Sequence, residues 1–346
     1  MSSLKSRFLS TFIALGATFA LTVATIAPAE AQRQTIRIAT SSTGSYGYAV
    51  GTVLSETIQR GLGRGFEVVV QPYPSTSGAM ISVMNGEGEF GYTADVGMRS
   101  LYDGARPYDD FSPRRGMLVH SLYVYPMETF MLVLDARKDE FNSYADFDGR
   151  PVFFTPAGFM NWLNMRRIFA ALGYEFNHVE IDSATVADAY QARSIDGSAG
   201  YTTAGRSLPT YWREAELRAN LAAINPTEEE KEKLRAAGLV PVEIDPSVAF
   251  SQELGVDRIW GVPIYFAYNV RADFDADLMK RILEILHENV ERLVDGDPGF
   301  GPLAADFVGT QAAGVAANPD IPVHPGLAAF LKDHGQWDDS WTIAGQ

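Results

Sequence analysis

One pattern repeats along this chain and limits the folds that it can adopt. An apolar, strand-like run leads into a turn rich in Ser, Thr or Asp, and the turn leads into residues with helical spacing. The pattern occurs three times between residues 35 and 102 and three more times between residues 151 and 207. Alternating strands and helices form parallel sheets that carry helices on both faces. We therefore predict an α/β protein with two successive parallel sheets, one in each of two lobes.

The turns of this pattern are the expected ligand site. In open parallel sheets, the carboxyl ends of the strands and the amino ends of the following helices face one crevice. Helix N-termini carry unpaired N–H groups and partial positive charge, so a cluster of them attracts a carboxylate or a phosphate. The predicted contacts are Thr43, Gly44, Ser45, Tyr46, Tyr48, Ser75, Thr76, Ser77, Asp95, Thr155, Gly158, Phe159, Asn161, Trp162 and Arg206. Any single Ser, Thr or Asp here also suits a helix N-cap, so the prediction depends on the convergence of the turns.

Two extended segments connect the two groups of strands. Residues 128–137 lie between the groups and residues 264–271 follow the second one. We interpret them as two crossings that form a two-strand hinge, with the ligand cleft between the lobes. The predicted boundaries place lobe 1 at residues 32–127 and 266–346, and lobe 2 at residues 128–265.

Two further helices are predicted outside these groups. The charged segment at residues 226–238 has Thr227 in the N-cap position and Gly238 as a stop, and its charges indicate a solvated surface. Residues 274–294 place apolar side chains at helical spacing. This spacing predicts one long C-terminal helix with a buried face.

Residues 1–31 predict a secretory signal peptide. A basic start at Lys5, an uncharged apolar stretch at residues 8–26 and an Ala-Glu-Ala motif precede Gln32, before which we expect cleavage. Hydroxyl residues and glycine interrupt the apolar stretch, which makes a retained membrane anchor the weaker interpretation. We therefore expect a periplasmic protein without membrane insertion after cleavage.

The net charge of the chain limits the classes of partner that it is expected to bind. The formal net charge is −15 over 346 residues, whereas nucleic acids and anionic membranes call for basic surfaces. We therefore expect neither partner, and any bound anion must be held by local groups. The chain has no cysteine, so its stability must come from buried apolar surface rather than from disulfides. We also expect a monomer.

Patterns for catalysis and for metal binding are scarce. The segment TGSYG at residues 43–47 is similar to a nucleophile elbow, but Thr43 stands where that strained turn needs a glycine. None of the five histidines has a local catalytic signature, and no zinc, calcium or dinucleotide motif is present. We therefore predict no enzyme, no cofactor and no metal, with an esterase-like enzyme that uses Ser45 as the weaker alternative.

Taken in order, the turn motifs resemble one known family, the TAXI receptors of TRAP transporters. The resemblance rests on TSSTGSYGYAVG at residues 40–51, PSTSGAM and GEFGYTADV in the next two turns, TPAGFMNWLNM at residues 155–165, GVPIYFAYNV at residues 261–270 and a C-terminal IPVHPG. It spans nearly the whole chain after residue 31. It implies a type II periplasmic binding protein fold and a receptor that delivers a small solute to a sodium-driven membrane permease. Members of the family are associated with glutamate, glutamine and related carboxylates.

This chain departs from the family pattern at the expected cleft. Gly47 stands where a tyrosine is usual, which predicts a roomier first turn. Phe159 and Met160 replace a small hydroxyl residue and a glycine, and with Trp162 they offer apolar area. We therefore expect a small organic anion with an apolar or aromatic part, its carboxylate held near these residues: Thr43, Gly44, Ser45, Ser75 and Thr76, with Arg206 as counter-charge. A receptor that senses a ligand for a membrane kinase would share all these residues and stays an open alternative.

Overall fold

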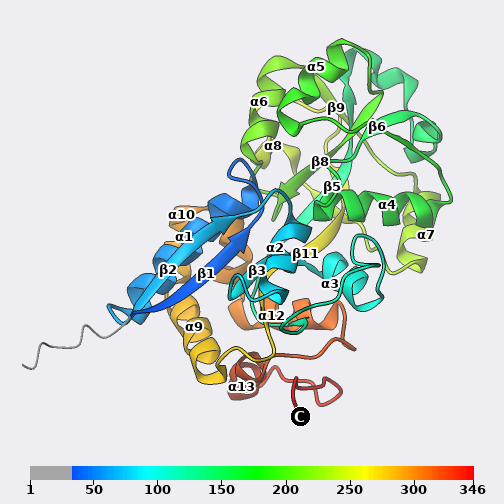
Figure 1. The fold of residues 1–346 in the computed structure, drawn as a ribbon. Helices are drawn as coiled ribbons and strands as arrows, with labels where there is room; N and C mark the ends of the chain where they lie inside the picture. The colour runs from blue at the N-terminus through cyan, green and yellow to red at the C-terminus, as the bar shows by residue number, and fades with distance from the viewer. Residues whose placement is uncertain (1–32) are drawn as a thin grey trace, which may run out of the picture. The chain divides into compact units, whose positions relative to one another are not determined.

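The computed structural model describes residues 33–346, so the predicted signal peptide lies outside the described residues. Strands and helices alternate through most of these residues, and the fold is of the mixed α/β class that the repeated pattern predicts (Figure 1). Among residues 33–346, no helix is long and apolar enough to cross a membrane.

The first three strand–turn–helix units are present as predicted. Their strands are β1 (Gln34–Thr40), β2 (Phe66–Pro72) and β3 (Phe90–Ala94), which are parallel in the order β2-β1-β3. The helices that follow them are α1 (Tyr46–Leu62), α2 (Thr76–Met84) and α3 (Asp95–Tyr102). Because β1 has a neighbour on each side and helices over it, its branched side chains Ile36 and Ile38 are buried.

The second group of units is also present. Its strands are β6 (Pro151–Phe153), β7 (Asn177–His178) and β8 (Gly197–Thr203), and β6 pairs in parallel with both of the others. Its helices are α4 (Met160–Leu172), the short 3-10 helix η3 (Ser183–Thr185), α5 (Val186–Gln191) and α6 (Thr210–Arg218). Gly173 ends α4 with a φ of 79°, a conformation that glycine adopts without strain.

The expectation of two separate sheets is wrong, because two long antiparallel strands join both groups. These are β5 (Tyr123–Leu134) and β11 (Ile259–Arg271), which pair with each other. β11 also pairs with β3, and β5 also pairs with β8. The result is one sheet of eleven strands with the central order β2-β1-β3-β11-β5-β8-β6-β7. Short strands β4 (Leu118–Val119), β9 (Leu221–Ile224) and β10 (Val242–Ile244) pair with β11, β5 and β11 respectively.

The first crossing ends earlier than predicted. β5 stops at Leu134, and the 3-10 helix η1 (Asp135–Glu140) follows it. The guanidinium of Arg137 pairs with Glu140 at 2.7 Å and with Asp196 at 2.6 Å, so the chain turns there instead of continuing as a strand. A second 3-10 helix, η2 (Tyr144–Phe147), leads toward β6.

The charged segment forms α7 (Glu228–Ala236) with Thr227 as its N-cap, as predicted. It is not wholly a solvated helix, however, because Glu230 is 3% exposed. The Glu230 carboxylate accepts hydrogen bonds from the Ala145 N–H at 2.9 Å and from the Tyr174 hydroxyl at 3.1 Å. One acid of this run therefore ties α7 to the body of the protein. The short helix α8 (Pro246–Ala249) follows.

The predicted long C-terminal helix is broken at Asn289 into α9 (Ala276–Glu288) and α10 (Val290–Gly296). Asn289 has φ −119° and ψ 27°, and its side-chain amide donates to the Ile285 carbonyl at 2.7 Å. An asparagine that bonds the backbone in this way competes with the helix. The remaining elements are η4 (Pro298–Phe300), α11 (Gly301–Ala305), α12 (Phe307–Ala316) and α13 (Pro325–Asp333).

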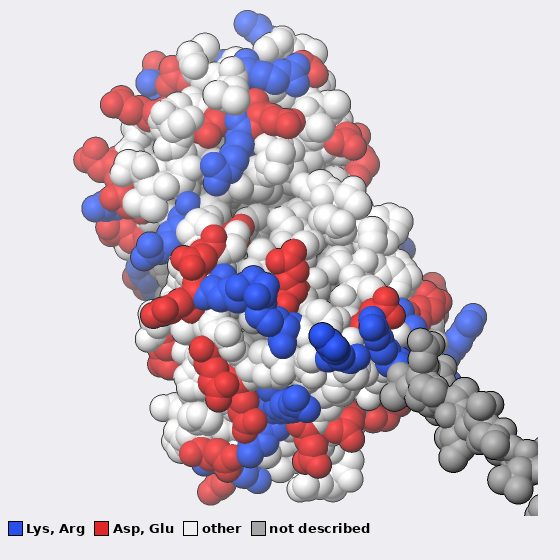
Figure 2. Space-filling view, turned by 90° about the vertical axis from the view of Figure 1, so that its left-hand side faces the viewer, with Lys and Arg blue, Asp and Glu red and all other residues white. Residues whose placement is uncertain are grey.

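Charged side chains are mixed on the face of the protein that Figure 2 shows. Lys and Arg side chains there lie beside Asp and Glu side chains, and several of the basic ones form a row across the middle of that face.

Candidate ligand-binding site

Serine side chains cap the helices of the first two turns. Ser45 Oγ accepts a hydrogen bond from the Tyr48 N–H at 3.2 Å and lies 2.6 Å from Ser41 Oγ. Ser75 caps α2 in the same way, by accepting from the Gly78 N–H at 3.1 Å. These two serines therefore have the capping role that their positions allow, and each fixes the start of a helix.

Tyr46, rather than Tyr48, turns inward from the start of α1. Tyr46 is 5% exposed, and its ring lies edge-on to that of Tyr125 with 5.5 Å between the centroids. Its hydroxyl donates to the Asp297 carboxylate. Burial, together with the charge of Asp297, raises the pKa of Tyr46 above its usual range, so the phenol stays a hydrogen-bond donor. Tyr48 is half-buried and lines neither of the two cavities described below.

Gly47 does not make the first turn roomier, contrary to the expectation. A Cβ atom at this position would lie 2.3 Å from Cε1 of Tyr92. The ring of Tyr92 is held by stacking on Phe266 with 5.0 Å between centroids, and its hydroxyl lies 2.9 Å from that of Tyr125. The space that the glycine leaves is therefore filled by a tyrosine of β3.

Replacing Gly47 by alanine is expected to destabilise the fold by about 1–3 kcal/mol, the usual effect of overpacking a well-filled core. Gly44→Ala is the matched control, because a Cβ at Gly44 would meet no atom within 4 Å. Chemical denaturation of both variants measures the difference. Equal midpoints would show that Tyr92 moves aside freely and that the packing argument is wrong.

The second and fourth turns contact each other directly. The backbone N–H and the hydroxyl of Ser77 both donate to the Gly158 carbonyl, at 3.2 and 3.0 Å. Gly158 has a φ of 91°, and a Cβ there would lie 3.2 Å from the side chain of Ser75. Glycine is thus needed at this contact for both conformation and space. These predicted site residues hold the turns together instead of facing an open cavity.

Backbone strain marks the start of the fourth turn. Thr155 has a φ of 92°, which a β-branched residue rarely adopts, and its buried hydroxyl has no hydrogen-bond partner within residues 33–346. Helix α4 then starts after Phe159, whose side chain cannot cap it. Asn161, in the first turn of α4, donates from its side-chain amide to Thr129 Oγ1 at 3.2 Å. The fourth turn therefore presents a helix N-terminus without a side-chain cap.

The N-termini of α1, α2 and α4 meet at an inner cavity of about 10 Å³, room for about one water molecule. Five predicted residues line it: Ser45, Tyr46, Thr76, Phe159 and Asn161. None of the three helices has an acidic residue in its first turn. Thr76, whose hydroxyl is a possible donor, is 1% exposed. Converging helix N-termini favour a negatively charged group.

A larger outer pocket of about 500 Å³ adjoins the inner cavity, since Ser45 and Phe159 line both. Its walls come from four of the predicted turns and from α6. The lining residues are Ser42, Gly44, Ser45, Pro74, Pro156, Phe159, Asp182, Ser183, Ala184, Thr210, Tyr211 and Glu214. This volume lies within the range of small-molecule sites. The inner cavity and the outer pocket together form the candidate site.

The apolar wall of the site differs from the expected one. Trp162 packs against His178, with 6.2 Å between ring centroids, and the Arg166 guanidinium lies 4.6 Å from its ring centroid. Met160 is fully buried, with its sulfur 2.5 Å from a Cβ built on Gly97. Neither side chain lines either cavity. Phe159 does, and Tyr211 provides the second aromatic side chain of the outer pocket.

The predicted charged residues also lie outside both cavities. Asp95 accepts from the Tyr265 N–H at 2.9 Å, and burial raises the pKa of its carboxyl, which the nearby Arg167 partly offsets. Arg206 is exposed and lies against Gly301, so it is not placed as a counter-charge for a ligand. Thr43 is exposed and lines neither cavity.

Strand residues that the sequence analysis missed complete the inner cavity. They are Tyr92 of β3, Met127 of β5, Tyr201 of β8 and Phe266 of β11. Their apolar character predicts only burial. For Tyr92 and Tyr201 a signal was available, because each lies two residues before the end of a strand that leads into a predicted site turn.

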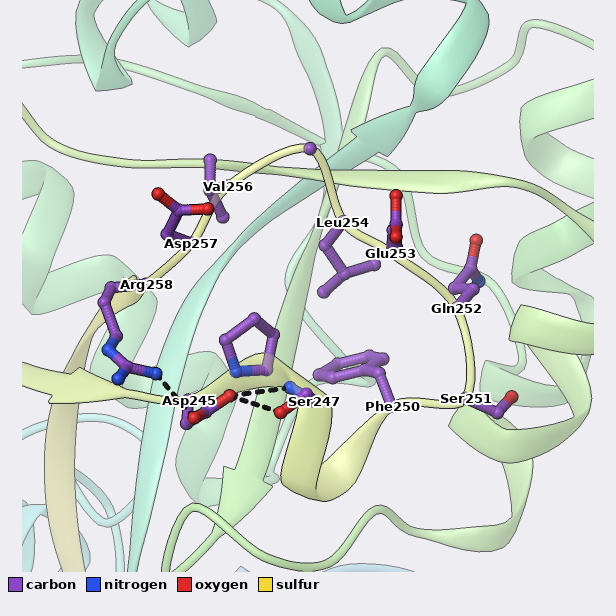
Figure 3. Close-up of a pocket in the computed structure, with 12 residues that line it drawn as sticks. Asp245, Ser247, Phe250, Ser251, Gln252, Glu253, Leu254, Val256, Asp257 and Arg258 are labelled. Atoms are coloured by element: carbon purple, nitrogen blue, oxygen red, sulfur yellow. Dashed lines mark hydrogen bonds and ion pairs between the residues drawn. The ribbon is translucent and has the colours of Figure 1, made fainter.

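A hollow of about 710 Å³ lies elsewhere and is lined only by residues 245–258, which include α8 (Figure 3). Its carboxylate Asp245 is already engaged, with the Ser247 N–H at 3.0 Å and the Arg258 guanidinium at 2.6 Å. None of the predicted turns contributes to it. Because ligands of open parallel sheets lie at the strand ends, we assign the candidate site to the outer pocket and the inner cavity.

The hydrogen bonds of Ser45 bear on the alternative of an esterase-like enzyme. Its Oγ interacts with Ser41 and with the Tyr48 N–H, and no histidine side chain is bonded to it within the described residues. A serine nucleophile needs a base within hydrogen-bond reach. Within residues 33–346 there is also no group of three His, Cys, Asp or Glu side chains placed to hold a metal ion.

One family model matches most of this chain. A family model described as the NMT1-like family matches residues 38–335. A search of curated protein sequences finds no match.

Solved structures share the fold at low sequence identity. MatC from Rhodopseudomonas palustris with bound malate is 10% identical at a TM-score of 0.52, over 87% of this chain and 98% of that one. The alkanesulfonate-binding protein SsuA from Xanthomonas axonopodis pv. citri bound to MOPS is 14% identical at a TM-score of 0.47, over 90% and 96%. The fold matches that of type II periplasmic binding proteins, as predicted.

Proposed function

Because the chain belongs to the NMT1-like family of non-enzymatic solute-binding proteins, we propose that it is the periplasmic receptor of a TRAP-type transporter. Its resemblance to the TAXI receptors indicated the same family. In this role it captures a small organic acid and delivers it to a membrane permease. Cleavage before Gln32 would release it into the periplasm as a monomer.

The observation that carries the proposal is the convergence of three helix N-termini on the inner cavity. The first turns of α1, α2 and α4 contain no acid, and Thr76 and Asn161 line the cavity. The cavity has to widen beyond its room for one water molecule to admit a carboxylate, which then accepts from Thr76, from Asn161 and from free N–H groups of the helices, without a cationic side chain. The outer pocket then takes the rest of the ligand against Phe159 and Tyr211.

Delivery requires that the cleft opens and closes. We propose that β5 and β11 form the hinge between lobe 1, at residues 32–127 and 266–346, and lobe 2, at residues 128–265. The bond from Ser77 to Gly158 then crosses the cleft and belongs to the closed form. A ligand that contacts turns of both lobes favours closure, because it binds the closed form more tightly.

Removing the Thr76 hydroxyl tests the carboxylate site. Mass spectrometry of the small molecule that co-purifies with the protein identifies the ligand for calorimetry. Thr76→Val is expected to weaken its binding by about tenfold or more, since a hydrogen bond to a charged group contributes roughly 1.5–3 kcal/mol. Thr43→Val is the matched control, because Thr43 is exposed and lines neither cavity. Unchanged affinity of Thr76→Val, or a ligand without an acidic group, would contradict the proposal.

A further inference from the structure

β2 is an edge strand of the sheet, and among the strands of residues 33–346 it pairs with β1 alone. Figure 1 shows it at one end of the sheet. Its sequence is FEVVVQP, and all three valines are only partly buried. An exposed edge of β-branched residues is a template for pairing with a further strand, so folded proteins protect such edges.

The backbone groups of β2 alternate between the side of β1 and the outer side. The N–H of Tyr73 donates to the Thr40 carbonyl at 2.9 Å. The Gly65 carbonyl accepts from the Gln34 N–H at 3.0 Å, so the odd-numbered residues face β1. Because successive residues of a strand point their N–H and C=O groups to opposite sides, the even-numbered residues within 66–72 face outward.

The side chain of Gln59, in the last turn of α1, covers the first part of this outward row. Its Nε2 donates to the Phe66 carbonyl at 3.1 Å, and its Oε1 accepts from the Val68 N–H at 2.9 Å. A further bond to the Gly63 carbonyl at 3.2 Å anchors the amide. One residue of a parallel partner strand makes the same pair of bonds, to a carbonyl and to the N–H two residues later. The Gln59 amide thus takes the place of a neighbouring strand.

The part of the row that stays open is short. Within residues 33–346, no strand pairs with the outward backbone groups of Val70. Pro72 ends the row without an N–H to donate. The open edge therefore consists of the Val68 carbonyl and the two backbone groups of Val70, which is too little for a ladder.

We propose that the outer edge of β2 is a pairing surface for a second copy of this chain, and that Gln59 keeps this surface closed. An edge strand is complementary to itself, because two copies related by a two-fold axis can pair as antiparallel strands. Freeing the backbone groups of Phe66 and Val68 extends the open edge over most of β2. No residue of β2 lines either cavity of the ligand site, so this surface can be tested without a ligand.

Replacing Gln59 by leucine tests the surface, because leucine keeps the size and helix propensity of glutamine but makes no hydrogen bond. Sedimentation equilibrium is expected to show self-association at least about tenfold tighter than that of the wild type, since each copy gains two backbone groups to pair. Gln59→Lys is the matched control. It removes the same bonds, but a lysine at a sheet edge opposes pairing, so this variant should stay as monomeric as the wild type. A monomeric Gln59→Leu, or equal association of both variants, would overturn the proposal.

Two further measurements separate edge pairing from adhesion of the new leucine and from misfolding. Adding Val70→Pro to Gln59→Leu removes the remaining outward N–H, which an edge strand tolerates, and is expected to restore the monomer. Association that persists would show that the leucine itself is adhesive and that the proposal is wrong. Hydrogen exchange of the wild type needs no variant: the Val68 N–H is expected to exchange at least about tenfold more slowly than the Val70 N–H. Equally fast exchange at both positions would contradict the role of Gln59.

Discussion

Replacing Glu128 by glutamine is expected to stabilise the protein by about 3 kcal/mol at neutral pH and above, and to have no effect near pH 4. Glu128 is 5% exposed on β5, and burial raises the pKa of its carboxyl from 4.5 to about 7. Between these values the folded protein holds a proton that the unfolded chain has lost, so the wild type loses stability as pH rises through this window. Glutamine stays neutral and removes that loss.

Glutamine also preserves the hydrogen bonds of the site. A single carboxylate oxygen of Glu128 accepts from the Thr202 hydroxyl at 2.7 Å and from the Gly205 N–H at 3.0 Å. The amide oxygen of glutamine can take its place. Urea unfolding at a series of pH values measures the effect, with Glu56→Gln on the exposed face of α1 as control. Parallel pH curves for wild type and Glu128→Gln would show that the pKa of Glu128 is the same in the folded and the unfolded protein, which would contradict the prediction.

The fold could be predicted where its signals are local. Alternating apolar runs and hydroxyl-rich turns identified the units around β1, β2, β3, β6 and β8, because periodicity and capping depend on neighbouring residues. Joining both groups into one sheet depends on pairing of β3 with β11, which lie far apart in sequence. The break at Asn289 depends on one side chain that bonds the backbone of Ile285. Neither the pairing of these strands nor the break in the helix leaves a periodic pattern in the sequence.

The site was predictable as a set of turns but not as a set of contacts. The sequence places Ser45 and Thr76 at helix starts, and the structure brings both to the inner cavity. Which side chain fills the space beside Gly47 depends on Tyr92, a strand residue whose ring direction no local pattern specifies. The same holds for Trp162, whose helix turns it toward His178 and away from the pocket.

A second large effect is expected at the end of β8. Thr203 and Ser207 are 0% and 2% exposed, and within residues 33–346 their hydroxyls have no partner of good hydrogen-bond geometry, although both lie near the Tyr46 hydroxyl and act to lower its pKa. Thr203 Cγ2 lies 2.9 Å from a Cβ built on Gly299, so this turn packs on the C-terminal segment that also holds Asp297. Under the proposed lobe boundaries, the two hydroxyls belong to lobe 2 and are buried against lobe 1. Closure then removes both from water, which costs about 1–3 kcal/mol each.

Thr203→Val combined with Ser207→Ala is therefore expected to tighten ligand binding by more than about tenfold, since the closed form loses a cost of about 1–3 kcal/mol at each position and the apparent affinity scales with its population. Calorimetry with the co-purifying ligand measures the affinity, and small-angle X-ray scattering of the ligand-free variant should show a radius of gyration closer to that of the ligand-bound wild type. Thr202→Val is the contrasting control: its hydroxyl bonds Glu128, so its loss should lower stability without tightening binding. Because neither hydroxyl makes a well-formed hydrogen bond in the fold, we infer that they oppose closure until a ligand contributes contacts to both lobes. Weaker binding by the double variant would refute this role.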